Sequence, residues 1–151
     1  MNYLLDTNIV LIYGRASSLS NKIEEKYQLF DGTHNLFISV VTLGELDSLI
    51  KQLNYGEKKK SRINTIVEDL VKLDIHYKEI IEQYGDIDAY SQGKLKTEPS
   101  NFSSRNMGKN DLWIAATANV YDLTLITTDK DFEHLRKTFL NLEYVNLEDY
   151  S

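Results

Sequence analysis

Residues 3–10 read YLLDTNIV, a short apolar run that ends at Asp6 and passes directly into a helix-like pattern. The same change, with one acidic residue at the junction, recurs at Glu45 in ISVVTLGEL (38–46), Asp111 in GKNDLWIAATA (108–118) and Asp129 in LTLITTDKDF (123–132). In an α/β fold such junctions lie at the carboxyl ends of the strands, which a parallel sheet brings to one edge. Carboxylates gathered there repel one another unless a cation lies among them.

Strand and helix patterns alternate along the rest of the chain. Apolar and β-branched runs predict strands at Tyr3–Leu5, Leu36–Val41, Leu123–Thr127 and Glu143–Asn146. Apolar residues at spacings of three and four predict helices over 18–29, 42–54, 58–73, 76–92, 111–120 and Phe132–Phe139. This order predicts βαβ units, a parallel sheet, and a helical insert between residues 42 and 110 that covers one side.

The composition is that of one soluble domain spanning residues 1–151. The chain is 42% hydrophobic and 26% charged, which allows both a core and a solvated surface. It has no cysteine, which excludes disulfides, thiolate zinc sites and cysteine nucleophiles. Because Asp6 and Asn8 interrupt the first apolar stretch and no basic leader precedes it, we predict neither a signal peptide nor a membrane span. We expect a cytoplasmic protein.

Two of the junction acids also fit structural roles. Asp6 can cap a helix that begins at Thr7, since aspartate is a favoured N-cap. Alternatively it is a metal ligand supported by the short polar side chains of Thr7 and Asn8. Glu45 lies three residues after Thr42, which is the spacing of a capping box. If Glu45 instead projects over the sheet edge toward Asp6, it is a ligand.

The other two junctions leave similar alternatives. Asp111 lies in the first turn of an alanine-rich helix that Asn110 can cap, so it either compensates the helix dipole or binds a cation. One of Thr128, Asp129 or Asp131 must cap the last helix. We assign Asp129 as the ligand and Asp131 as the cap or supporting residue, although these two roles could be exchanged.

A site built from these four carboxylates has a definite metal preference. Oxygen ligands without cysteine or nearby histidine select Mg²⁺ or Mn²⁺ over zinc. Such ions can activate water and stabilise a leaving oxygen during phosphodiester cleavage, with one or two ions in the site.

Together the segments LLDTNIV, SVVTLGEL, GKNDLWIAATA and LITTDKDF resemble the PIN-domain ribonuclease family, and more closely its VapC-type toxins, over residues 3 to about 135. The resemblance implies a three-layer α/β/α sandwich and an RNA endonuclease that depends on Mg²⁺ or Mn²⁺. It implies that Asp6, Glu45, Asp111 and Asp129 are catalytic and bind the metal, with Thr7, Asn8, Thr128 and Asp131 in support. It further implies a homodimer and a small antitoxin partner.

The net charge of −6 argues against binding a polyanion through the overall field, so RNA contact requires local basic groups. We predict RNA-binding roles for Arg105 and Lys109, whose loop leads into Asp111, and for the run Lys58, Lys59, Lys60 and Arg62. A solvated helix face is the alternative for that run.

Three other functions compete with a toxin ribonuclease. An RNA-processing protein with the PIN fold would contain the same four motifs. Phosphoryl transfer through an aspartyl phosphate also uses a strand-end aspartate and Mg²⁺, but LLDTN lacks the second aspartate of a DxD motif. A non-catalytic binding module would use the four acids only as helix caps.

Overall fold

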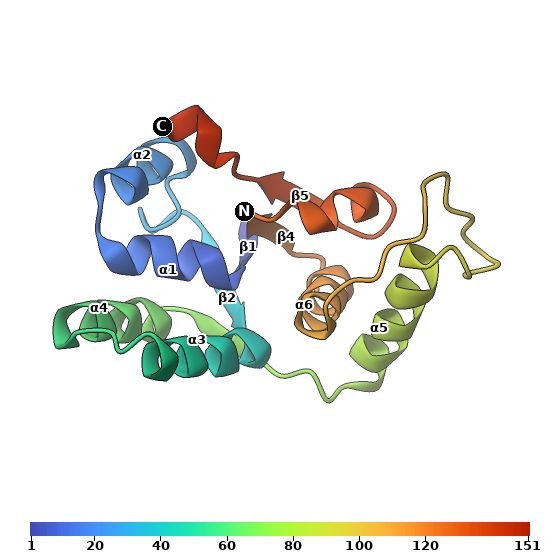
Figure 1. Ribbon diagram of the computed structural model, residues 1–151, viewed down its shortest axis with the longest axis horizontal. Coiled ribbons are helices and arrows are strands. Elements are labelled where there is room, and N and C mark those ends of the chain that lie inside the picture. Colours follow the sequence, from blue (N-terminus) through green and yellow to red (C-terminus); the bar gives the residue numbers. More distant parts are fainter.

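The computed structural model describes residues 1–151. Its centre is a sheet of five strands, all parallel, in the order β3-β2-β1-β4-β5 (Figure 1). The strands are β1 (Asn2–Leu5), β2 (Asn35–Ser39), β3 (Val71–Leu73), β4 (Thr124–Thr127) and β5 (Asn141–Tyr144). Because β1 is central and pairs with both β2 and β4, the residue that follows β1 lies in the middle of the carboxyl edge.

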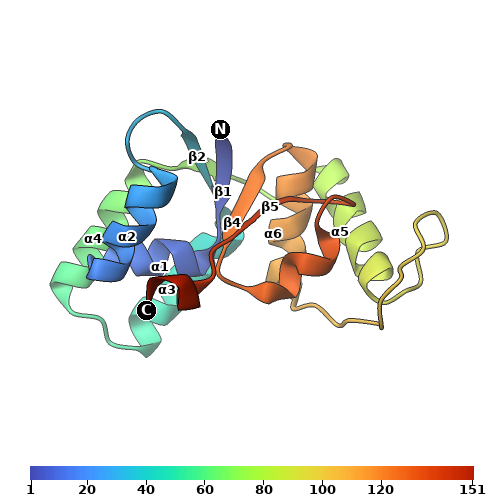
Figure 2. The same cartoon turned by 90° about the horizontal axis from the view of Figure 1, so that it is seen from above.

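Helices form a layer on each face of this sheet (Figures 1 and 2). One layer contains α1 (Thr7–Arg15), α2 (Ser18–Tyr27), α3 (Val40–Gln52) and α4 (Glu57–Glu68), and the other contains α5 (Lys78–Ser91) and α6 (Lys109–Val120). Two short 3₁₀ helices, η1 (Lys130–Leu135) and η2 (Leu147–Tyr150), follow β4 and β5. The predicted three-layer α/β/α fold is therefore confirmed, and the sheet is entirely parallel.

Successive side chains of β1 point to opposite faces of the sheet, so the core has two parts. Leu4 packs with α5 and α6 on one face, whereas Tyr3 and Leu5 pack with α1 and α2 on the other. Gly14 lets α1 and α4 approach closely, because a Cβ there would lie 2.6 Å from Ile63 Cγ1. No helix is both long and apolar enough to cross a membrane.

The strand β3 corrects the prediction of one helix over 58–73. The helix α4 ends at Glu68, and Val71–Leu73 pairs in parallel with Phe37–Ser39 of β2. Leu70 and Leu73 continue the apolar spacing of α4, so the sequence pattern alone favoured a longer helix. Pairing with β2, which the local sequence does not encode, decides the strand. The predicted helical insert is thus interrupted by a strand.

The chain after β4 also differs from its prediction. A 3₁₀ helix at Lys130–Leu135 replaces the expected helix over Phe132–Phe139, and the last strand is Asn141–Tyr144 rather than Glu143–Asn146. Lys137 has a positive φ of 68°, which prevents a helix from continuing through this position.

Candidate metal centre

Asp6 lies between β1 and α1 and is only 5% exposed. Its Oδ1 accepts a hydrogen bond from the backbone N of Thr7 at 2.8 Å, which caps α1. Its Oδ2 accepts a hydrogen bond from Thr127 Oγ1 at 2.6 Å. The predicted capping role is therefore confirmed, and Thr127 links the same carboxylate to the neighbouring strand β4.

Glu45 projects from α3 toward the start of α1. Its Oε1 accepts a hydrogen bond from Thr7 Oγ1 at 2.9 Å, and that hydroxyl also lies 3.3 Å from Thr42 Oγ1. The capping-box alternative is wrong, because Ser39 is the N-cap of α3 and Thr42 lies buried inside the helix. Thr7 thus connects the Asp6 junction with Glu45.

Three other carboxylates lie close enough to share one cation. Asp111, Asp129 and Asp131 each offer an oxygen atom, and these atoms all lie within 4.8 Å of one another. Asp129 Oδ1 accepts a hydrogen bond from the backbone N of Asp131 and caps η1, whereas Asp111 and Asp131 accept none through their side chains. The assignment of Asp131 as the cap is wrong, since Asp129 is the cap and Asp131 joins the carboxylate cluster.

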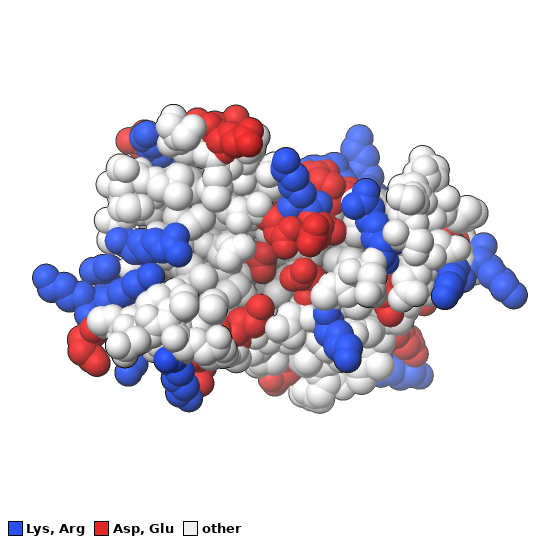
Figure 3. Space-filling model, viewed as in Figure 1, with Lys and Arg blue, Asp and Glu red and all other residues white.

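The two groups of acids belong to one electrostatic environment. Burial is the largest of the causes that together raise the pKa of Asp111 to about 7, followed by the negative charges of Asp6 and Asp129 and then those of Glu45 and Asp131. Burial also raises the pKa of Asp6, although its hydrogen bonds from Thr127 and Thr7 oppose that shift. Figure 3 shows acidic side chains gathered near the middle of one face. The charges of all five carboxylates therefore act on one another at this edge of the sheet.

The raised pKa of Asp111 makes stability depend on pH. Its ordinary pKa is 3.8 and its folded pKa is about 7, so the folded protein binds this proton more tightly than the unfolded chain. The resulting stabilisation is fully present below about pH 4 and is lost as the pH rises through 7. With chelator present, we expect the melting temperature of Asp111→Asn, measured relative to that of the wild type, to be higher at about pH 8 than at pH 5. Parallel pH profiles for the two proteins would contradict the shift.

Two predicted supporting residues are not brought into this network. Asn8 is exposed, and the side chains of Asn8 and Thr128 make no hydrogen bonds within the protein. Asn110 does not cap α6, because the N-cap is Gly108 and Asn110 lies within the first turn.

Thr127 is the supporting residue that sequence reasoning missed. Besides binding Asp6, its Oγ1 accepts a hydrogen bond from the backbone N of Asp129 at 3.0 Å. The register pairs Leu4 with Leu125 and Leu5 with Ile126, so its continuation places Thr127 beside Asp6. That register would have selected Thr127 over Thr128, but it requires knowing that β1 and β4 are neighbours.

The predicted basic residues lie in two separate regions. Lys58, Lys59, Lys60 and Arg62 belong to α4, and basic side chains gather at the end of the molecule where α4 lies, away from the central acids (Figure 3). In this run Lys59 Nζ lies 3.5 Å from the centroid of the Tyr55 ring, and Arg62 Nε donates to Gly14 O at 2.7 Å. By contrast, Lys109 is the first residue of α6, two positions before Asp111, and both Lys109 and Arg105 are exposed.

The residues present fit a hard divalent cation. The cluster offers only carboxylate oxygens, and the carboxylates of Asp111 and Asp131 have no hydrogen-bond donor within the protein. A cation would stabilise their ionised forms and so oppose the burial and the charge repulsion that raise the pKa of Asp111. Asp111, Asp129 and Asp131 would hold the ion, with Asp6 and Glu45 beside them.

The PIN domain family matches residues 3–138, which is nearly the whole chain. The chain belongs to the PIN domain family. This confirms the family resemblance carried by the four acidic motifs and agrees with the parallel sheet. No curated protein sequence matches the chain.

Solved structures of VapBC proteins, a family of toxin–antitoxin systems, and of FitAcB share this fold. VapBC-1 from nontypeable Haemophilus influenzae is 28% identical, with a TM-score of 0.66, over 95% of this chain and 98% of that chain. VapBC2 from Rickettsia felis, solved bound to a DNA fragment from their promoter, is 23% identical with a TM-score of 0.71 over the same fractions. FitAcB from Neisseria gonorrhoeae is 22% identical with a TM-score of 0.65, over 93% and 95%. The similarity to VapC-type proteins thus extends over almost the entire PIN domain.

Proposed function

We propose that this PIN-domain protein is a VapC-type toxin that cleaves phosphodiester bonds of structured RNA, such as transfer or ribosomal RNA, with Mg²⁺ or Mn²⁺. The observation that carries the proposal is the convergence of Asp111, Asp129 and Asp131 within 4.8 Å, beside Asp6 and Glu45. The similarity to VapBC-1 supports the toxin role. When bound, the ion supplies an activated water and stabilises negative charge on phosphate oxygens.

The chain itself contributes orientation and proton control. Thr127 fixes Asp6, and Thr7 fixes Glu45, so neither carboxylate is free to rotate away from the edge. Asp111, with a pKa of about 7 in the absence of an ion, can exist in either protonation state near neutral pH. Asp6 is 5% exposed and both its oxygens accept hydrogen bonds, which disfavours it as a phosphoryl acceptor.

The test is cleavage of an end-labelled structured RNA by the purified protein. We expect cleavage with Mg²⁺ or Mn²⁺, loss of cleavage in excess chelator, and recovery when Mn²⁺ is added back. Cleavage that persists in chelator would exclude the metal mechanism. No cleavage under any metal condition, with RNA still bound, would favour a binding module.

We also propose a small antitoxin partner, following the VapBC pairs that share the fold, and a homodimer, which the resemblance to VapC-type toxins implies. The same cleavage assay tests the partner: addition of the small protein encoded beside this chain should inhibit cleavage. If that protein leaves cleavage unchanged, an RNA-processing role becomes the better explanation.

A further inference from the structure

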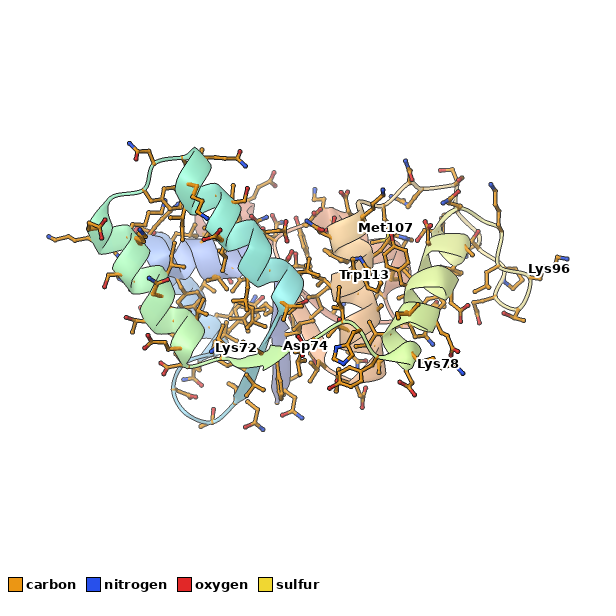
Figure 4. All side chains as sticks on the ribbon, turned by 90° about the horizontal axis from the view of Figure 1, so that it is seen from below. Lys72, Asp74, Lys78, Lys96, Met107 and Trp113 are labelled. Atoms are coloured by element: carbon orange, nitrogen blue, oxygen red, sulfur yellow. The ribbon has the colours of Figure 1, made fainter.

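A groove of about 570 Å³ lies between α3, α6 and the segment that leads into α5. Its lining combines apolar side chains, among them Val41, Leu49, Ile75 and Trp113, with the polar side chains of Glu45, Ser48 and Asn110. Figure 4 labels Trp113 on α6, with α3 on one side and α5 on the other. No basic side chain lines the groove, so a phosphate group has no counter-charge there.

Trp113 is the only tryptophan in the chain and is half-buried. The ring of Tyr84 packs against it, with the centroids 4.3 Å apart and the planes tilted by 42°. The indole is therefore held in place by α5 while it also contributes to the wall of the groove. A large aromatic surface that remains partly open is suited to stacking with another flat ring.

The groove is continuous with the candidate metal centre. Glu45 lines the groove and also accepts the hydrogen bond from Thr7, the residue that follows Asp6. On the opposite wall, Asn110 directly precedes Asp111. A molecule whose phosphate lies at the carboxylates could therefore place a neighbouring group in the groove.

We propose that this groove binds an unpaired nucleobase of a single-stranded RNA, on a nucleotide adjacent to the phosphodiester bond at the metal centre. This inference rests on the proposed ribonuclease function and names the form of RNA that the site accepts. A base is neutral and flat, so it suits apolar walls and an indole, and the Asn110 amide offers both a donor and an acceptor to its edge. Bases of a duplex remain stacked on one another and cannot enter.

The single tryptophan allows a direct test by fluorescence. A short single-stranded RNA should quench Trp113 in the Asp111→Asn protein, which is used so that no RNA is cut. A duplex of the same sequence should not quench it. Absence of quenching, or equal quenching by the duplex, would overturn the proposal. A change of the spectrum with protein concentration in the absence of RNA would also overturn it, because a second copy would then cover the groove.

Matched variants distinguish stacking of a base on Trp113 from a role of Trp113 in packing alone. Trp113→Leu should weaken binding of a labelled single-stranded RNA roughly 5- to 100-fold, because stacking on an aromatic side chain is lost. Trp113→Phe should retain most of the affinity. Tyr121→Leu removes an exposed aromatic ring just past the other end of α6 and should leave affinity unchanged. Equal affinity in the wild type and Trp113→Leu would overturn the assignment.

The two proposals can fail separately. Quenching by single-stranded RNA without any cleavage by the wild type would support the groove and exclude the ribonuclease. Cleavage that is unaffected by Trp113→Leu would support the ribonuclease and exclude the groove. If both hold, Trp113→Leu should raise KM while kcat changes little.

Discussion

Replacing Asp111 with asparagine should lower the rate of RNA cleavage by at least about 100-fold. Asp111 accepts no hydrogen bond within the protein, lies with Asp129 and Asp131, and has its pKa raised to about 7 by burial and by neighbouring charges. Asparagine keeps the shape of the side chain but removes one anionic ligand and the titrating proton. Single-turnover cleavage of an end-labelled RNA in Mn²⁺ measures the effect.

The control for this variant is Asp47→Asn. Asp47 is an exposed carboxylate on α3 that pairs with Lys51, so its loss changes the net charge equally without touching the cluster. Asp111→Asn should not lower the melting temperature, because it removes a carboxylate whose ionised form is disfavoured by burial. A folded Asp111→Asn protein that cleaves at the wild-type rate would contradict a role for the cluster in catalysis.

Manganese should stabilise the wild-type protein against heat in proportion to the logarithm of its concentration. At 100 times the dissociation constant, a single bound ion adds about 2.7 kcal/mol to the free energy of unfolding. For a chain of this size that corresponds to a rise in melting temperature of roughly 5–10 °C. The affinity for manganese comes from the clustered carboxylates, because a bound ion relieves the repulsion between them. Differential scanning fluorimetry in a chelator-treated buffer measures it.

Variants of the cluster should reduce this metal-dependent shift. Asp131→Asn tests the residue that the structure adds to the site, since its carboxylate accepts no hydrogen bond within the protein. Asp129→Asn removes a second ligand but can still cap η1 through its side-chain oxygen. Asp47→Asn should retain the full shift. A shift that is the same in all three variants would place the bound ion elsewhere on the protein.

The positions of the acids were predictable because each follows a local rule. Asp6 directly follows a strand, and Asp111 lies in the first turn of an alanine-rich helix, so both could be recognised within a few residues of sequence. Convergence then followed from the parallel order of strands and helices, which places all such junctions at one edge.

Assignments that depend on a partner in space were less predictable. The Thr42–Glu45 spacing fits a capping box, yet the helix begins two residues earlier, at Val40, and Glu45 bonds to Thr7 of another helix. The wrong cap assignment after β4 has a similar origin, because either Asp129 or Asp131 can cap a short helix. The geometry of the turn after β4 selects Asp129.

The sequence by itself determined the alternating α/β order, the PIN domain family and the strand-end acids, because apolar periodicity and short motifs are properties of neighbouring residues. Only the tertiary structure decided that Val71–Leu73 is a strand, that Thr127 binds Asp6 and that Asp131 joins Asp111 and Asp129. The physical reason is that strand pairing and register join residues far apart along the chain. A shift of one residue in that register would turn Thr127 to the opposite face of the sheet.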